Sequence, residues 1–259
     1  MIRRFLLALA LLAASVSAQA GYYTDIWWKP TESGWGVNLV QTDDFIFATF
    51  FIYGPDGKPT WYTANLVWNG TDAYAGDALT HQGTFFGVPW NTANNLHVKA
   101  GTASFKPSAA NSYEGTLTYS ITGVGAATKA IERQSLTAPA LGGTYVGGQP
   151  GTYAGCTLPA NSTPYKDYFD LTVNHLANGT VTMVFDFTSG LSCTLSGTLV
   201  QNGQLYRIPS ATYTCSDGLD TTASLTQIKS TSQGIEGRLF AADVGDGCSE
   251  SASFSAAIQ

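Results

Sequence analysis

The sequence predicts an all-β protein made of two small antiparallel β-barrel or β-sandwich domains in tandem. No stretch of ten or more residues keeps the 3.6-residue period of an amphipathic helix, whereas short alternating apolar and polar runs recur between turn sequences. All six tryptophans precede residue 91, and all four cysteines follow residue 155, so the two halves differ in kind. Closed barrels and two-sheet sandwiches both limit exposed strand edges, and we expect one of them in each half.

The first 20 residues are typical of a secretory signal peptide. Met1-Ile2-Arg3-Arg4 supplies positive charge, Phe5 to Ala14 is apolar, and Ala18-Gln19-Ala20 is the small-x-small pattern that signal peptidase recognises. The apolar run is too short to span a membrane as a helix, which takes about 20 residues. We therefore expect cleavage near Ala20, export to the periplasm or beyond, and no membrane span in the mature chain.

The mature chain is acidic. Loss of Arg3 and Arg4 with the signal changes the formal net charge from −6 to −8. The remaining sequence has no basic run of even three residues. Phosphate contacts from Lys and Arg dominate affinity for nucleic acids, so the sequence predicts no nucleic-acid partner.

Residues 21–136 form the predicted tryptophan-rich domain. Its strongest strand is Phe45 to Tyr53, which is apolar on both alternating faces. Such a pattern predicts a strand covered on both sides. Gly54-Pro55-Asp56-Gly57-Lys58 is a turn that leads to the partner strand. About seven strands are expected here: 34–41, 45–53, 61–68, 74–81, 96–105, 113–121 and 129–136.

Residues 137–143 are predicted to be a linker, because Pro139, Gly142 and Gly143 interrupt any regular element. Residues 144–259 then form the second domain. It opens with two short related segments, Gly143 to Gly147 and Gly151 to Gly155. Further strands are expected at 168–173, 180–187, 193–200, 205–213, 223–228, 235–241 and 252–258.

The four cysteines predict two disulfides, because an exported chain meets an oxidising compartment and a zinc site needs closely spaced pairs. Four cysteines allow three connectivities. Asn202-Gly203 is a strong hairpin turn that would bring Cys193 nearly opposite Cys215 once a bulge or slightly longer loop is allowed. This favours Cys193–Cys215, which leaves Cys156–Cys248.

A resemblance covers most of the first half. Trp28-Lys29-Pro30-Thr31-Glu32-Ser33-Gly34-Trp35-Gly36, followed by Tyr53 and the run Gly57-Lys58-Pro59-Thr60-Trp61-Tyr62, resembles a group of secreted proteobacterial proteins of uncharacterised function. The shared pattern is W-x-P-x-E-S-G-W-G with a later G-x-P-x-W-Y. The resemblance implies a bacterial exported protein and carries over no catalytic residue.

Glu32 is the one candidate catalytic residue. It lies among tryptophans, and a carboxyl group among aromatic rings can have a raised pKa and act as a general acid, as in glycosidases. That chemistry needs a second carboxylate, and the spacing of Asp43, Asp44 and Asp77 selects none. The alternative is a structural role, in which Glu32 accepts hydrogen bonds from backbone amides of the Ser33-Gly34 turn.

Aromatic residues of the first half are the candidate ligand-binding residues, since flat rings pack against the C–H faces of sugars. We expect Trp61 and Trp68 in the core, because they lie on strands. The residues near turns and in the tryptophan cluster are the candidate binding set: Trp27, Trp28, Trp35 and Trp90.

No metal or cofactor site is predicted. His81, His97 and His175 are far apart in the sequence, and Asp243 to Gly247 lacks the ligand positions of a calcium loop. The leading hypothesis is a secreted, non-catalytic protein that binds a glycan or another extracellular polymer. The alternatives are an extracellular hydrolase with Glu32 as its acid, and a protein inhibitor or assembly module.

Overall fold

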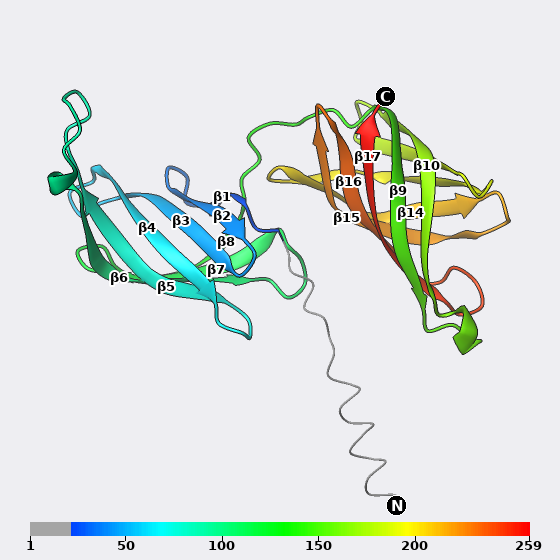
Figure 1. The fold of residues 1–259 in the computed structure, drawn as a ribbon, viewed down its shortest axis with the longest axis horizontal. Coiled ribbons are helices and arrows are strands. Elements are labelled where there is room, and N and C mark those ends of the chain that lie inside the picture. The colour runs from blue at the N-terminus through cyan, green and yellow to red at the C-terminus, as the bar shows by residue number, and fades with distance from the viewer. Residues whose placement is uncertain (1–21) are drawn as a thin grey trace, which may run out of the picture.

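The computed structural model describes residues 22–259 and confirms the predicted fold class (Figure 1). The chain forms two antiparallel, up-and-down β-barrels, each closed by pairing between its first and last strands. The predicted signal peptide lies outside the described residues.

The first barrel has eight strands, and each is hydrogen-bonded to its neighbours in sequence order. They are β1 (Asp25–Trp28), β2 (Gly36–Thr42), β3 (Phe45–Tyr53), β4 (Pro59–Trp68), β5 (Tyr74–Gln82), β6 (Leu96–Pro107), β7 (Glu114–Ile121) and β8 (Gly125–Arg133), with the 3₁₀ turn η1 (Thr92–Asn94) between β5 and β6.

The second barrel repeats this topology. Its strands are β9 (Gly143–Ala154), β10 (Pro164–His175), β11 (Thr180–Phe187), β12 (Ser192–Thr198), β13 (Val200–Asn202), β14 (Leu205–Cys215), β15 (Asp220–Thr231), β16 (Gly234–Ala241) and β17 (Ser249–Ile258), with η2 (Pro159–Asn161) before β10. The short strand β13 pairs only with the start of β14, and β12 pairs with the rest of β14, which continues the barrel wall.

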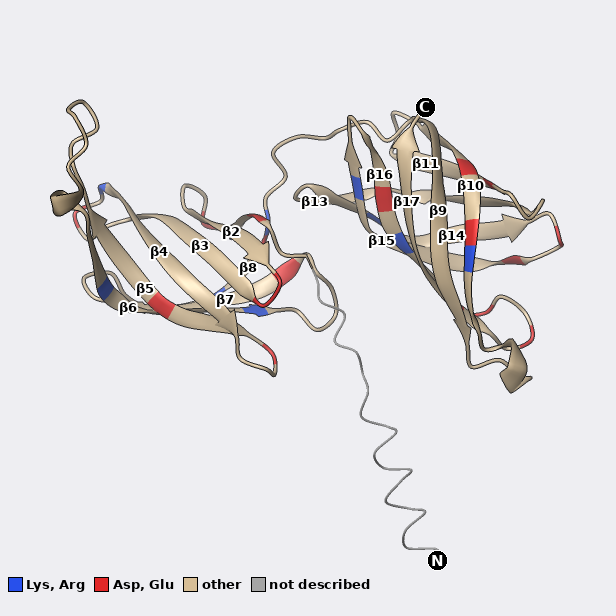
Figure 2. Ribbon diagram, in the orientation of Figure 1, with Lys and Arg blue, Asp and Glu red and all other residues tan. Residues whose placement is uncertain are grey.

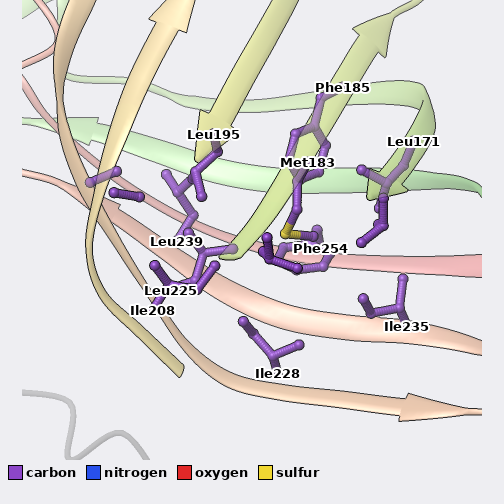
Figure 3. Close-up of a cluster of buried hydrophobic side chains, with 14 of the residues drawn as sticks. Leu171, Met183, Phe185, Leu195, Ile208, Leu225, Ile228, Ile235, Leu239 and Phe254 are labelled. Carbon is purple, nitrogen blue, oxygen red and sulfur yellow. The ribbon is translucent and has the colours of Figure 1, made fainter. Parts of the chain in front are cut away.

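Alternating side chains fill each barrel. In the second barrel, Met183, Leu225 and Phe254 come from different strands and meet in one buried cluster, which Figure 3 shows in close-up. In the first barrel, Trp27, Phe50 and Phe105 are fully buried members of the core. Each barrel therefore has its own apolar core.

The structure corrects the prediction that the strand Phe45 to Tyr53 is covered on both faces. Ile46, Ala48 and Phe50 point into the barrel and are buried, whereas Phe47 and Phe51 point outward and are exposed. A single-layered barrel wall has only one packed side, so the outward aromatic residues have no layer of this chain above them in the described region.

Two element boundaries also differ from the prediction. The first barrel contains the short strand β1, which was not among the expected strands. Strand β9 is continuous, although its glycines suggested two short segments. At Gly147 an added Cβ would lie 2.1 Å from the backbone oxygen of Ser255, so that glycine allows close approach of β17 rather than a break in β9.

Both predicted disulfides, Cys193–Cys215 and Cys156–Cys248, are present. Cys193 lies directly opposite Cys215 in the pairing of β12 with β14. The two-residue turn is Gly203-Gln204 rather than Asn202-Gly203, because Asn202 pairs with Leu205. The register shifts by one residue between the pairs Val200–Arg207 and Gly197–Ala211, where two residues face three residues of β14, and this shift brings the cysteines opposite each other.

The turn between β13 and β14 contacts the first barrel. Gly203 N–H donates to Ser135 Oγ at 3.1 Å, and Gln204 N–H donates to Asp25 Oδ2 at 3.1 Å. The same carboxylate forms a fully buried ion pair with Arg133 at 3.0 Å. A polar interface therefore joins the two barrels beside the linker.

Candidate ligand-binding face

An exposed apolar surface covers the outside of β2, β3 and β4. We call it the aromatic face and define it by its outward side chains, which are 37% to 54% exposed: Val40, Phe45, Phe47, Phe51, Tyr53, Trp61 and Val67. Strands β3 and β4 carry no charged residue, as Figure 2 shows by their uniform tan colour. Charged residues in this region lie in the turns that join the strands.

Strand register places the members of this face next to one another. Phe51 lies directly opposite Trp61 across β3 and β4, and Phe45 lies opposite Val67. On the other side of β3, Phe47 lies opposite Val40 of β2. Directly opposite side chains on one face of an antiparallel pair lie about 5 Å apart. The apolar side chains therefore form two groups along β3, and the polar pair Thr49–Thr63 lies between them.

Trp61 is fixed in position by a histidine. Its ring stacks on the ring of His81 with centroids 4.9 Å apart and an angle of 4° between the planes. His81 Nε2 lies 2.6 Å from Thr63 Oγ1, and His81 Nδ1 lies 2.7 Å from His97 Nδ1. Burial, together with the neighbouring His97, lowers the pKa of His81.

The β5–β6 loop, residues 83–95, projects beyond the end of the first barrel (Figure 1). It carries the exposed rings of Phe85 and Phe86, and Phe86 is 99% exposed. Thr84 anchors the base: its Oγ1 donates to the Asn91 carbonyl at 2.8 Å and accepts from the Asn91 N–H at 3.0 Å. No charged residue occurs between positions 78 and 98, so the loop and its flanking strand ends are uncharged.

The four predicted binding tryptophans do not form one surface. Trp27 is 0% exposed and its Nε1 donates to the Tyr23 carbonyl inside the barrel, so its assignment as a ligand-binding residue is wrong. Trp28 and Trp35 are half-buried. Trp90 is 62% exposed and packs beside Gly83, two residues beyond His81.

The expectation that Trp61 lies in the core is also wrong, since it is 51% exposed, whereas Trp68 packs against the core as expected. Position on a strand indicates burial only when the side chain faces inward. Trp61 and Phe51 are functional candidates that the sequence argument missed. Strand alternation placed Phe51 on the face opposite Phe50 but did not indicate which face would be exposed.

Glu32 is held between two ammonium groups. Its Oε1 lies 2.5 Å from Lys29 Nζ, and its Oε2 lies 2.5 Å from Lys129 Nζ. Trp35 Nε1 also donates to Oε2, at 3.2 Å. Hydrogen bonds from Lys129 and Lys29 lower the pKa of Glu32 to about 2. A general acid needs a raised pKa, so the geometry supports a structural role, with lysine and tryptophan donors instead of the expected backbone amides.

A second carboxyl group, Glu250, has the opposite electrostatic environment. It is 3% exposed inside the second barrel, and burial raises its pKa. Gln149 Nε2 donates to Glu250 Oε1 at 3.2 Å, and the hydroxyls of Tyr165 and Tyr213 also hydrogen-bond to the carboxyl group. No sequence pattern pointed to this group, because its partners come from three other strands, β9, β10 and β14.

Throughout residues 22–259, no three His, Cys, Asp or Glu side chains gather into a group that could hold a metal ion. Over the same residues, no helix has the length and apolar character needed to cross a bilayer. An open groove runs over the outside of β5 to β8 and is lined mainly by small and hydroxyl residues, including Thr102, Thr118 and Thr128.

No family model matches this chain, and no curated protein shows significant similarity to it.

Proposed function

We propose that this protein is an exported, non-catalytic binding protein whose aromatic face holds a glycan or another extended extracellular polymer. The observation that carries the proposal is the uncharged row of exposed rings along β3, with Trp61 beside it on β4. Soluble proteins seldom expose an apolar surface of this kind unless it has a binding role.

The shape of the row favours an extended ligand over a compact one. Outward rings occur at Phe45, Phe47, Phe51 and Tyr53 of a single strand. Eight residue steps of a strand span about 26 Å, at about 3.3 Å per residue. A surface of that length suits a chain of several sugar units, whose ring C–H groups can contact successive aromatic faces.

The aromatic face is preorganised, and it also carries polar groups. Trp61 is stacked on His81, which in turn lies within hydrogen-bonding distance of Thr63, so the ring is positioned before any ligand arrives. A preorganised surface loses less conformational entropy on binding. Asn65 lies between Thr63 and Val67 on the outward side of β4 and supplies an exposed amide.

Export is part of the proposal. The two disulfides suggest an oxidising environment such as the periplasm or the cell exterior. The predicted signal peptide and the resemblance to secreted proteobacterial proteins support the same compartment. A net charge near −8 without the signal disfavours nucleic acid as the polymer.

The test is a titration of the purified, disulfide-bonded protein with soluble oligosaccharides of several linkages, monitored by tryptophan fluorescence. We expect a saturable change for at least one of them. Phe51→Ala removes the ring opposite Trp61 and keeps Trp61 as the fluorescent reporter. Affinity should fall roughly tenfold, because an aromatic contact contributes about 0.5–1.5 kcal/mol beyond its buried area.

Tyr168→Ala is the matched control, because Tyr168 is an exposed aromatic residue of the second barrel. It should bind as the unmodified protein does. A flat titration with every oligosaccharide, or equal loss in both variants, would contradict the proposal. Release of reducing ends during the titration would instead indicate the hydrolase, and a protein captured through the face would indicate an assembly module.

A further inference from the structure

His81 and His97 are far apart in the sequence but directly opposite in the pairing of β5 with β6. Their Nδ1 atoms are 2.7 Å apart, close enough to share one proton or one metal ion. We propose that these two imidazoles form a binding site for a late divalent transition metal, and that Cu²⁺ fits it best. This inference does not rest on the proposed polymer binding.

The ring of His81 is oriented by its neighbours. Thr63 is buried, and its Oγ1 lies 2.6 Å from His81 Nε2. When Nε2 carries the proton and donates it to Thr63, the lone pair of Nδ1 points toward His97. Metal-binding histidines are held in this way, by a hydrogen bond from the nitrogen that does not bind the metal. Stacking on Trp61 fixes the plane of the same ring.

The distance between the two nitrogens is compatible with adjacent ligand positions around one ion. With metal–nitrogen bonds of about 2.0 Å, a right-angled pair of ligands separates the nitrogens by about 2.8 Å, and a tetrahedral pair by about 3.3 Å. The observed 2.7 Å is close to the first value. Tetragonal nitrogen and oxygen sites favour Cu²⁺, which also forms the most stable complexes among the first-row divalent ions.

Metal binding at this pair requires only that one proton move within an imidazole ring, and no other reagent is consumed. In the metal-free protein, the Nδ1–H of one ring is shared with Nδ1 of the other. His97 is exposed, so its proton can move to Nε2 and leave both Nδ1 lone pairs for the ion. The remaining equatorial positions are then filled by water.

The charged residues nearest to the two histidines along β5 and β6 form an ion pair with each other. Lys99 and Asp77, on the same two strands, form an ion pair at 2.6 Å. The lysine is therefore already matched by a carboxylate and adds little net repulsion toward a cation. The pair of histidines stays accessible from solvent, at the edge of the aromatic face.

The experiment is a titration of the purified protein with CuCl₂ in a non-coordinating buffer near neutral pH. We expect one equivalent to bind, with two nitrogen ligands in the electron paramagnetic resonance spectrum. Copper is a strong short-range quencher, so the fluorescence of Trp61 should fall. His81→Ala and His97→Ala should each weaken binding at least about 100-fold, because each leaves a single imidazole.

His175→Ala is the matched control, since His175 is the third histidine of the chain and lies at the end of β10 in the second barrel. It should bind copper as the unmodified protein does. Thr63→Val preserves shape and removes the orienting hydroxyl, and affinity should fall about tenfold. Absence of stoichiometric binding, or binding that survives His81→Ala and His97→Ala, would overturn the inference.

This outcome is separable from that of the oligosaccharide titration. Copper binding is measured without sugar, and the sugar titration can be made in the presence of a chelator. Failure of one measurement leaves the other unaffected, because Phe51 is not a metal ligand and His97 is not part of the aromatic face.

Discussion

Glu250 is a carboxyl group enclosed by neutral hydrogen-bond partners. Gln149, Tyr165 and Tyr213 donate to it, and Tyr153 stacks on Tyr165 with ring centroids 4.7 Å apart. Burial raises the pKa of Glu250, although the three donors act in the opposite direction. Nearby, burial and the charge of Glu250 raise the pKa of Tyr153 to about 12. Burial therefore outweighs the three donors and favours the protonated form of Glu250.

This arrangement predicts a pH dependence of stability. The pKa of Glu250 is raised above its ordinary value of 4.5, so the folded state binds the proton more tightly than the unfolded state. The resulting stabilisation is complete below pH 4.5 and is lost as pH rises through the folded-state pKa. Glu250→Gln is neutral at every pH and should lack this decline.

The measurement is the free energy of unfolding by urea, taken between about pH 4 and pH 8. The stability of Glu250→Gln relative to the unmodified protein should increase with pH. Glu236→Gln is the control, because Glu236 is an exposed carboxylate on the neighbouring strand β16. A difference between Glu250→Gln and the unmodified protein that stays constant with pH would contradict the assignment.

At the scale of elements, strand alternation predicted the fold but not which alternating face would be covered. The pattern of Phe45 to Tyr53 is compatible with a strand inside a two-layered sandwich or with a barrel wall that exposes aromatic residues. Sequence period alone does not separate these, because both bury Ile46, Ala48 and Phe50. Whether a second layer exists depends on how the whole sheet closes, which is a property of all eight strands.

The contact between His81 and His97 and the hydrogen bonds of Glu250 also could not be predicted from the sequence. His81 and His97 are joined by a long loop, so their registration depends on the bulge at Ala78 and Leu79 as well as on the turn. In contrast, Cys193 and Cys215 lie on strands close in sequence, with a recognisable turn between them. Their pairing was predictable because few registers were possible.

The two disulfides should contribute unequally. Cys156–Cys248 joins residues 92 apart in sequence, and Cys193–Cys215 joins residues 22 apart. The chain-entropy model assigns about 4.6 kcal/mol to the longer loop and about 3.4 kcal/mol to the shorter one. We therefore expect the paired replacement of Cys156 and Cys248 by Ala to lower the free energy of unfolding more.

Urea denaturation of the two double-alanine variants measures this difference. Cys193 is fully buried, whereas Cys156 is 8% exposed. Replacing Cys193 therefore loses more packing, which opposes the difference expected from loop entropy. A larger loss for the Cys193 and Cys215 variant would show that core packing outweighs loop closure in this barrel.

At the scale of the whole molecule, the two barrels meet through polar groups rather than through a shared core. Tyr113 of the first barrel accepts the Gln227 N–H of the second at 2.8 Å, and the Arg207 guanidinium lies over the Tyr113 ring. Gln227 has a positive φ of 52° within a bulge of β15, which directs its amide toward the partner barrel. Together with Asp25 and Arg133, these contacts limit rotation about the linker.

Gly203 is the residue on which this junction depends most. It has a φ of +66°, and an added Cβ would lie 2.5 Å from both Arg133 Cβ and Asp25 Oδ2. The turn would have to withdraw, which breaks its hydrogen bonds to Ser135 and Asp25. We therefore expect Gly203→Ala to separate the barrels while each stays folded. The radius of gyration by small-angle scattering should increase, and proteolysis should be faster in the linker between β8 and β9, which the structure places at residues 134–142.

Gly179→Ala controls for the free-energy cost of placing alanine at a positive φ. Gly179 also follows an asparagine in a turn of the second barrel and has a φ of +83°, but nothing lies within 4 Å of an added Cβ. Both variants lose about 1–2 kcal/mol from forcing an L-residue into the left-handed region. Only Gly203→Ala should change the scattering profile and the rate of linker cleavage. Equal behaviour of the two variants would mean that the turn does not hold the barrels together, and that the linker alone sets their arrangement.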